Sequence, residues 1–325
     1  MTKLEEILSS GSIPSEIIQK INKLDEGGKD ALNSYYDETS EFYKNAQPML
    51  LARRFIADPQ KYATLYHYTT SDAFEAILKA KTFLAGSINY MNDEKEIKHT
   101  INLSTSLLNK LGASEQEITQ FKYNFIRAMS FFDVYLWSFT TNGSSMAMGR
   151  YGDVALGFNN QELQNILADN FTPRSFANGN MKNGDAFVFP LIVNYDKNFQ
   201  LNYLFPIIKV ILSCIRNMEI DPIDMSEILN SSLRSLYILS ICFKRPEIWE
   251  EREIRFLILR ITDDGTTNAD VVLNGKPRIE VPLDFNCLRQ VIIDRSWSGK
   301  EDEMRKLMDK YGFYKTNVSL TKLPY

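Results

Sequence analysis

The residues best suited to chemistry fall into three short clusters, and the first surrounds His67, one of only two histidines in the chain. It lies within Leu65–Thr69, a stretch that reads as a short strand. Side chains alternate between the two faces of a strand, so we expect Thr69 to share a face with His67. An imidazole beside a hydroxyl suits hydrogen bonding to a ligand hydroxyl. The alternative is a core histidine whose polar atoms are satisfied within the protein.

The second cluster begins at Trp137–Thr140 and continues to Gly152. Ser138 and Thr140 are expected on one face of a strand, opposite the two aromatic residues. Arg150 and Tyr151 follow between two glycines, and such a pair suits a planar, anionic ligand, because a guanidinium forms bidentate bonds with anions and stacks on rings. The alternative is a turn whose side chains only cover the end of the sheet.

The third cluster is the stretch Trp249–Ile258. As a strand, it directs Glu251, Glu253 and Arg255 to one face. The residues expected on its core face are Ile254, Phe256 and Ile258. Two adjacent carboxylates repel, and carboxylate pairs with shifted pKa values occur where an oxocarbenium-like transition state is stabilised. The alternative is a solvent-exposed face of Glu–Arg pairs.

Composition limits the class of protein. The 325 residues include 41 acidic and 37 basic ones, a net charge of −4, so a general affinity for nucleic-acid backbones is not expected. Three widely spaced cysteines and two histidines cannot build a Cys/His zinc site, and we expect reduced thiols. The N-terminal stretch has no signal-peptide pattern, and the apolar runs are too short to span a membrane. We expect a soluble, cytoplasmic protein.

Hydrophobic periodicity predicts an α+β fold. Residues 1–60 read as a helical cap or interaction segment, able to associate with itself or a partner, and 61–325 read as an α+β catalytic-type domain with a helical insertion at about 197–240. Further helices are expected at 72–79, capped by Ser71, and at 96–131, with a capping box at Ser114–Glu117; another is expected at 300–311. The expected strands are 65–69, 82–85, 135–140, 154–158, 187–195, 253–261, 271–273, 279–281 and 291–293, with a hairpin at Asn274–Gly275.

Taken together, the clusters resemble a bacterial family known as domain of unknown function 2971. The motifs that carry the resemblance are L-Y-H-Y-T-T at Leu65–Thr70, N-D-E at Asn92–Glu94, S-F at Ser138–Phe139, G-R-Y-G at Gly149–Gly152 and W-E-E-R-E-I-R at Trp249–Arg255. The resemblance covers about residues 65–297 and excludes the first 60. The resemblance implies a tryptophan in the loop before Arg150, but this sequence has Met148 and Gly149 there.

A more distant pattern is similar to the ADP-ribosyltransferase fold, through H-x-T at His67–Thr69, S-x-T at Ser138–Thr140 and E-x-E at Glu251–Glu253. This resemblance implies a split, mixed or antiparallel β core, NAD as the substrate and no metal. The ligand contacts that it implies are His67, Tyr68 and Thr69 on the ribose and adenylate side, Ser138 supporting Glu253, Arg150 on the diphosphate, and Tyr151 or Tyr90 on nicotinamide. Glu253 would stabilise the oxocarbenium ion, and Glu251 would orient or deprotonate the acceptor.

The expected function is therefore an NAD-consuming enzyme, which transfers ADP-ribose to a macromolecule or to water, in the manner of a bacterial toxin or phage-defence effector. The acceptor stays open between protein and nucleic acid. One alternative is a metal-dependent hydrolase or nuclease that uses Asp93, Glu94 and Glu96 with His67 or His99. Another is a non-catalytic sensor or interaction protein. Convergence of His67, Ser138 and Glu253 on one cleft would favour the enzyme.

Overall fold

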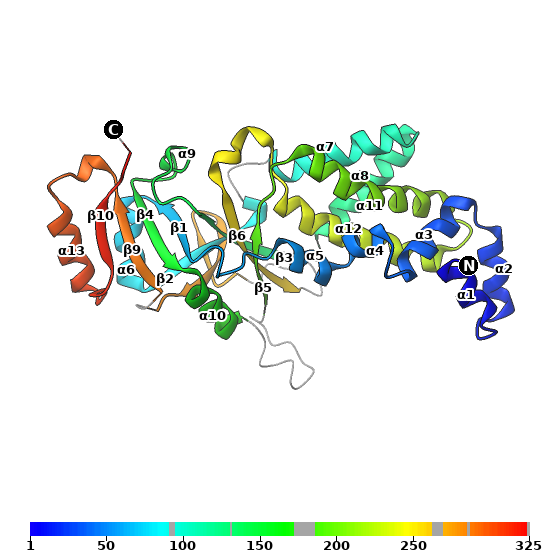
Figure 1. Ribbon diagram of the computed structural model, residues 1–325, viewed down its shortest axis with the longest axis horizontal. Helices are drawn as coiled ribbons and strands as arrows, with labels where there is room; N and C mark the ends of the chain where they lie inside the picture. The colour runs from blue at the N-terminus through cyan, green and yellow to red at the C-terminus, as the bar shows by residue number, and fades with distance from the viewer. Residues whose placement is uncertain (91–94, 131, 172–185, 262–268, 285–286, 324–325) are drawn as a thin grey trace. The chain divides into compact units, whose positions relative to one another are not determined.

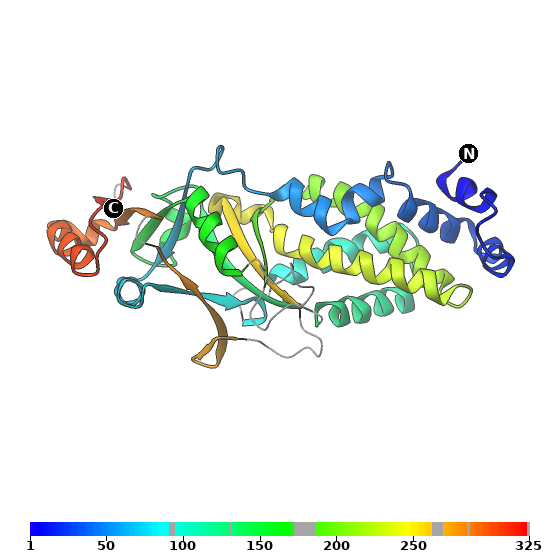
Figure 2. The same ribbon diagram turned by 90° about the horizontal axis from the view of Figure 1, so that it is seen from below.

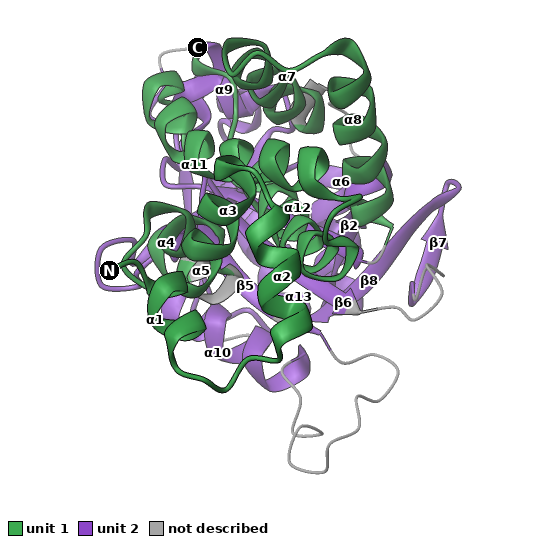
Figure 3. Ribbon diagram, turned by 90° about the vertical axis from the view of Figure 1, so that its right-hand side faces the viewer, with its two compact units in different colours: residues 1–54, 93–130, 194–246 green, residues 55–92, 131–193, 247–325 purple. Residues whose placement is uncertain are grey.

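The computed structural model describes residues 1–90, 95–130, 132–171, 186–261, 269–284 and 287–323 (Figures 1 and 2). Its contacts divide the chain into two units, and each unit is assembled from three segments (Figure 3). Unit 1 comprises residues 1–54, 93–130 and 194–246. Unit 2 comprises residues 55–92, 131–193 and 247–325.

Unit 1 is helical in its described residues. Its helices are α1 (Lys3–Ser9), α2 (Ser15–Lys23), α3 (Glu26–Tyr36), α4 (Glu41–Ala46), α5 (Pro48–Phe55), α7 (Lys95–Lys110), α8 (Glu115–Met129), α11 (Lys197–Asn217) and α12 (Pro222–Cys242). Three of its long helices begin where the sequence offers a cap. Ser114 and Glu117 form a capping box at α8, and Asp196 and Asp221 accept backbone N–H groups at α11 and α12. The helices α11 and α12 pack on each other and on α3, α4, α7 and α8.

The helix α11 is long and apolar enough to cross a membrane by length and composition alone. Of its most apolar window, 61% is buried inside the protein, and it is the one such helix in the described ranges. A core helix passes the same test, so this is weak evidence for a membrane span.

Unit 2 is built on a mixed sheet. Its strands are β1 (Thr64–Thr69), β2 (Thr82–Ser87), β3 (Phe132–Thr140), β4 (Val154–Asn159), β5 (Phe187–Ile192), β6 (Glu253–Ile261), β7 (Val271–Leu273), β8 (Lys276–Pro282), β9 (Leu288–Ile293) and β10 (Asn317–Leu320). The main path runs β10-β9-β4-β1-β3-β2-β8-β7, while β6 pairs with β3 and β5 with β6. The pair β9–β10 is parallel, and the other strand pairs are antiparallel.

The sheet is split beside β3. Strand β6 pairs with one side of β3 along its whole length, so β1 and β2 share the other side. Strand β2 pairs at Tyr135 and Leu136, whereas β1 pairs at Thr140. Residues 137–139 of β3 therefore lie where β1 and β2 diverge.

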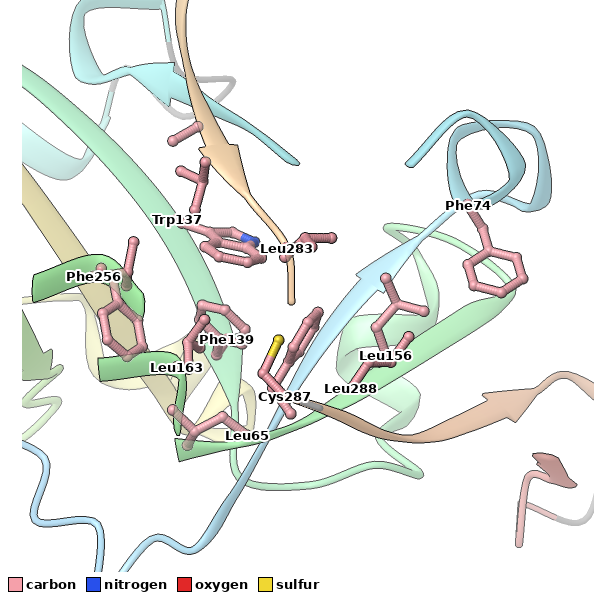
Figure 4. Packing of buried hydrophobic residues seen from close by; sticks show 14 of the residues in the cluster. Leu65, Phe74, Trp137, Phe139, Leu156, Leu163, Phe256, Leu283, Cys287 and Leu288 are labelled. Carbon is pink, nitrogen blue, oxygen red and sulfur yellow. The ribbon is translucent and has the colours of Figure 1, made fainter. Parts of the chain in front are cut away.

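One face of this sheet is apolar and forms the core of unit 2. Leu65, Trp137, Phe139, Phe256 and Leu156 point into it from the strands, as Figure 4 shows. The helices α6 (Ser71–Ala80), α10 (Asn160–Phe171) and α13 (Glu301–Lys310) bury apolar side chains in the same cluster. We call this the core face and the other face the polar face, because register places Tyr66, Thr140, Glu253 and Arg255 there.

The α+β prediction is confirmed, and most expected elements are present within a few residues. Three details differ. The cap of α6 is Thr70, and Ser71 is the first residue of the helix. Helix α10 and strand β10 were not expected. The helices α7 and α8 belong with the N-terminal segment in unit 1 and not with the strands, because these helices pack on α11 and α12.

Candidate functional site

The imidazole of His67 lies at the split in the sheet. Its Nδ1 is 2.8 Å from the carbonyl oxygen of Ser138. A carbonyl only accepts hydrogen bonds, so Nδ1 carries the hydrogen, and Nε2 of the neutral ring is an acceptor. The expected neighbour Thr69 shares the strand face of His67 and is buried.

Burial determines the charge of His67. Desolvation lowers its pKa to about 4, although the bond to Ser138 opposes the shift. The ring packs edge-on against Phe83 and Phe139, with centroid separations of 4.6 and 5.9 Å. The side chain is therefore neutral at pH 7 and presents a hydrogen-bond acceptor.

A pocket of about 250 Å³ opens at this place. His67, Ser138 and Tyr90 line it, and Tyr90 is about half exposed. Phe83 stacks on Trp137 along one side, with centroids 4.2 Å apart and an interplanar angle of 15°. These residues give the pocket aromatic walls beside a single acceptor nitrogen.

Lys276 and Arg278 also line the pocket, and its lining contains no Asp or Glu in the described part of the chain. Both basic residues lie on β8. They were not expected from the sequence. The sequence signal that could have found them is the alternation of charged residues Lys276, Arg278 and Glu280, which is typical of one face of a strand. No local pattern indicates that β8 pairs with β2, which is about 190 residues away in the chain. The pocket is consequently both aromatic and basic.

The expected catalytic carboxylate Glu253 lies on the polar face. It is opposite Thr140 in the β3–β6 register, and its Oε2 is 2.9 Å from a terminal nitrogen of Arg255. Both side chains are almost fully buried. Ser138, expected to support Glu253, is instead opposite Arg255. The register therefore makes Thr140, and not Ser138, the cross-strand neighbour of Glu253.

Glu251 lies in the turn before β6, at the end of a 3₁₀ segment (Pro246–Glu251), and is buried. Arg150 forms an ion pair with its carboxylate, and the Tyr151 hydroxyl is 3.3 Å from the same oxygen. Burial works against the charge of Arg150, but Tyr151 and Glu251 outweigh it and raise its pKa. The arginine expected on a diphosphate therefore holds a carboxylate.

Arg252, between the two carboxylates, adopts a left-handed conformation with φ of 43°. Such a conformation is uncommon for a residue other than glycine and is often found at functional sites. It separates the 3₁₀ turn from the strand, so Glu251 and Glu253 do not follow simple strand alternation.

Tyr68 connects β1 to the loop after β3. Its hydroxyl accepts from the Ser145 N–H at 2.7 Å and lies 3.3 Å from the Asn142 carbonyl oxygen. Tyr68 also lines a second pocket, of about 140 Å³, together with Ser145 and Asp153. Ser145 caps α9 (Met146–Gly149), which leads directly to Arg150. Tyr68 thus anchors the loop that positions Arg150 and Tyr151.

The expected residues form two groups. His67 and Ser138 meet at the first pocket, and the lining of that pocket does not include Glu253 in the described residues. His67 packs on the core face, whereas Glu253 lies on the polar face. His67 bonds to the Ser138 carbonyl of β3, and Glu253 is opposite Thr140 of the same strand. Those positions are about 7 Å apart at a strand rise of about 3.3 Å per residue.

The alternative metal site cannot be followed in the structure. Asp93 and Glu94 lie outside the described residues, as does the side chain of Glu96. His99, in unit 1, has its Nε2 2.9 Å from the Gln200 side-chain oxygen. Among the described residues there is no group of three or more His, Cys, Asp or Glu able to hold a metal ion. Cys214 and Cys287 are buried thiols, and burial raises the pKa of each to about 12.

Comparison with known proteins gives no further assignment. No protein-family model, curated protein or solved structure matches the chain.

Proposed function

We propose that unit 2 binds NAD at the split beside β3 and cleaves its nicotinamide–ribose bond, passing ADP-ribose to a macromolecule or to water. One observation carries the proposal. The neutral His67, in an aromatic and basic pocket, bonds to the backbone of Ser138, and the buried Glu253 is the cross-strand neighbour of Thr140. These two positions are two residues apart on β3.

The pocket chemistry supports a dinucleotide. The stacked Phe83–Trp137 pair offers an aromatic wall for a base, and Lys276 and Arg278 offer positive charge for phosphates. The acceptor Nε2 of His67 suits a ribose hydroxyl. A nucleotide combines these three features, and a cationic or purely apolar ligand does not.

The proposed reaction needs one fixed negative charge and one base. As the C–N bond breaks, its electron pair leaves with nicotinamide and the ribose carbon becomes cationic. Glu253 stabilises that charge. The acceptor oxygen or nitrogen then bonds to the ribose carbon and loses its proton to Glu251. The proposal requires the nicotinamide ribose to lie on the polar face, over Ser138 and Thr140.

The test is release of nicotinamide by the purified chain, compared with Glu253→Gln. We expect the substitution to reduce release at least about a hundredfold, because it removes the charge that stabilises the transition state. The control is Glu250→Gln, the same change in an exposed neighbour, with activity near that of the wild type. Equal activity of the two variants would overturn the assignment of Glu253.

A second candidate is a nucleotide-binding sensor without catalysis. The buried pair of Glu253 and Arg255 favours it, since such a pair also serves as a structural ion pair. Tight NAD binding that depends on His67, without nicotinamide release in the presence of cell extract, would establish the sensor instead.

A further inference from the structure

Two exposed side chains cover the carboxylate of Glu251, the base of the proposed reaction. Only 3% of Glu251 is exposed, whereas Tyr151 is 43% exposed and the side chain of Arg150 is 57% exposed. Both contact the same carboxylate oxygen, Arg150 through the ion pair and Tyr151 through its hydroxyl at 3.3 Å. Arg150 also donates to that hydroxyl at 2.8 Å. Because the carboxylate is buried and these partners are exposed, they lie between it and solvent, and we call them the Glu251 cover.

The loop of residues 141–153, which carries the Glu251 cover, is held on both sides of it. Before the cover, the Ser145 N–H donates to the Tyr68 hydroxyl at 2.7 Å. After it, the Asp153 carboxylate accepts from the Ser71 N–H at 2.9 Å. Both partners lie outside the loop, on β1 and at the start of α6. The Glu251 cover is therefore fixed by the fold.

We propose that water is the acceptor of ADP-ribose at this site, and that the Glu251 cover excludes larger nucleophiles. The inference rests on the proposed function and decides between the acceptors that it leaves open. A general base must lie within hydrogen-bond reach, about 3 Å, of the group whose proton it takes. Water is small enough to reach a covered carboxylate, whereas a side chain or nucleotide of a macromolecule has to displace Arg150 and Tyr151.

Local charge opposes both classes of macromolecular acceptor. Arg150 repels the lysine or arginine side chain of a protein. Glu247 and Glu250 are exposed on the 3₁₀ segment that ends at Glu251, and they repel the phosphates of a nucleic acid. Water carries no charge, so neither repulsion acts on it.

The reaction is then hydrolysis, and it needs no further reactant. The bond between nicotinamide and ribose breaks, and its electron pair leaves with nicotinamide. The oxygen of water bonds to the ribose carbon, and one proton of the water passes to Glu251 and then to solvent. The products are ADP-ribose, nicotinamide and one proton.

The first test is the product ratio from NAD in water that contains methanol or propanol, measured by mass spectrometry as ADP-ribose and its alkyl forms. This ratio does not depend on how much of a variant is folded. We expect the wild type to form almost no propyl product. Arg150→Ala and Tyr151→Ala should raise the propyl share at least about tenfold, the lower end for discrimination of one methylene.

The control is Tyr314→Ala, at an exposed tyrosine elsewhere in unit 2, which should give the wild-type ratio. Propyl product formed by the wild type as readily as methyl product would overturn the inference. A propyl share that stays unchanged in both cover variants would overturn it as well.

The second test follows labelled NAD in cell extract. Label that remains in free ADP-ribose supports water as the acceptor. Label on protein or nucleic acid overturns this inference and leaves the proposed function standing, because nicotinamide has then been released. If no nicotinamide forms, the proposed function and the choice of acceptor fall together.

The Glu251 cover is tested without NAD, by coupling carboxylates to glycine ethyl ester with a water-soluble carbodiimide. The exposed Glu250 is the internal reference and should react in every protein. Glu251 should be protected in the wild type and react in Arg150→Ala and Tyr151→Ala, as peptide mass spectrometry measures. Equal modification of Glu250 and Glu251 in the wild type would show that larger molecules reach the base, and would overturn the cover.

Discussion

At the scale of single residues, His67 carries the most information. A carbonyl partner determines which nitrogen bears the hydrogen, and burial keeps the ring neutral. Neither point is visible in the sequence, where His67 is equally compatible with a core role. The sequence does indicate its strand and its shared face with Thr69. That His67 lines a pocket follows only from the split between β1 and β2.

The lowered pKa of His67 predicts acid sensitivity. The unfolded chain binds a proton at about pH 6.5 and the folded one at about pH 4, so the free energy of unfolding falls as pH drops between these values. We expect a loss of up to about 2 kcal/mol between pH 7 and pH 5. Urea unfolding of the wild type and His67→Gln at both values measures it. An equal loss in both proteins would show that other groups are responsible.

The carboxylates show why a pattern within one strand is insufficient. Alternation correctly predicts that Ile254, Phe256 and Ile258 enter the core. It does not reveal that Thr140, two residues from the expected Ser138, is opposite Glu253, because pairing register depends on strands about 110 residues apart. Nor does it reveal the left-handed Arg252, which separates Glu251 from the strand.

At the scale of elements, the loop between β3 and β4 depends on Gly152. Its φ is 156°, and a Cβ there would lie 2.0 Å from the carbonyl oxygen of Thr69. We expect Gly152→Ala to displace the loop and to destabilise the protein by more than about 1 kcal/mol. The melting temperature should fall by at least about 2 °C. The ion pair between Arg150 and Glu251 should loosen as well, because Arg150 lies in the same loop and its position depends on the backbone of that loop.

Gly149→Ala in the same loop is the matched control. A Cβ at Gly149 meets nothing within 4 Å, so we expect wild-type stability. Thermal unfolding of the two variants measures the difference. If Gly152→Ala and Gly149→Ala had the same melting temperature, the close contact with β1 would not be the reason why glycine occupies position 152.

The elements missed from the sequence had different causes. Helix α10 had a usable signal, since Asn159 caps it and Leu163 and Leu167 lie four residues apart on its buried side. Strand β10 had none: it is short and pairs in parallel with β9, so no hairpin turn marks it. The hairpin at Asn274–Gly275 was expected from the Asn-Gly dipeptide, and both residues take the positive φ values that its turn requires.

At the scale of the whole molecule, the chain order conceals the units. Helices from three separate segments pack into unit 1, and strands from three segments form unit 2. The sequence indicates most of the helices and strands, but segments far apart in the chain associate through packing that local patterns do not encode. The domain boundary expected near residue 60 therefore marks the end of the first segment of unit 1, but it does not reveal that two later segments belong to the same unit.

Hydrogen exchange tests this organisation and the site together. We expect slow exchange in β3, which is paired on both sides, and fast exchange in β7 and β10, which end the strand path. NAD should slow exchange in β1, β2, β3 and β8, because these strands supply the pocket around His67. Mass spectrometry of peptides with and without NAD measures both effects. Protection by NAD confined to the helices of unit 1 would contradict the proposed site, because the ligand would then act outside the split sheet.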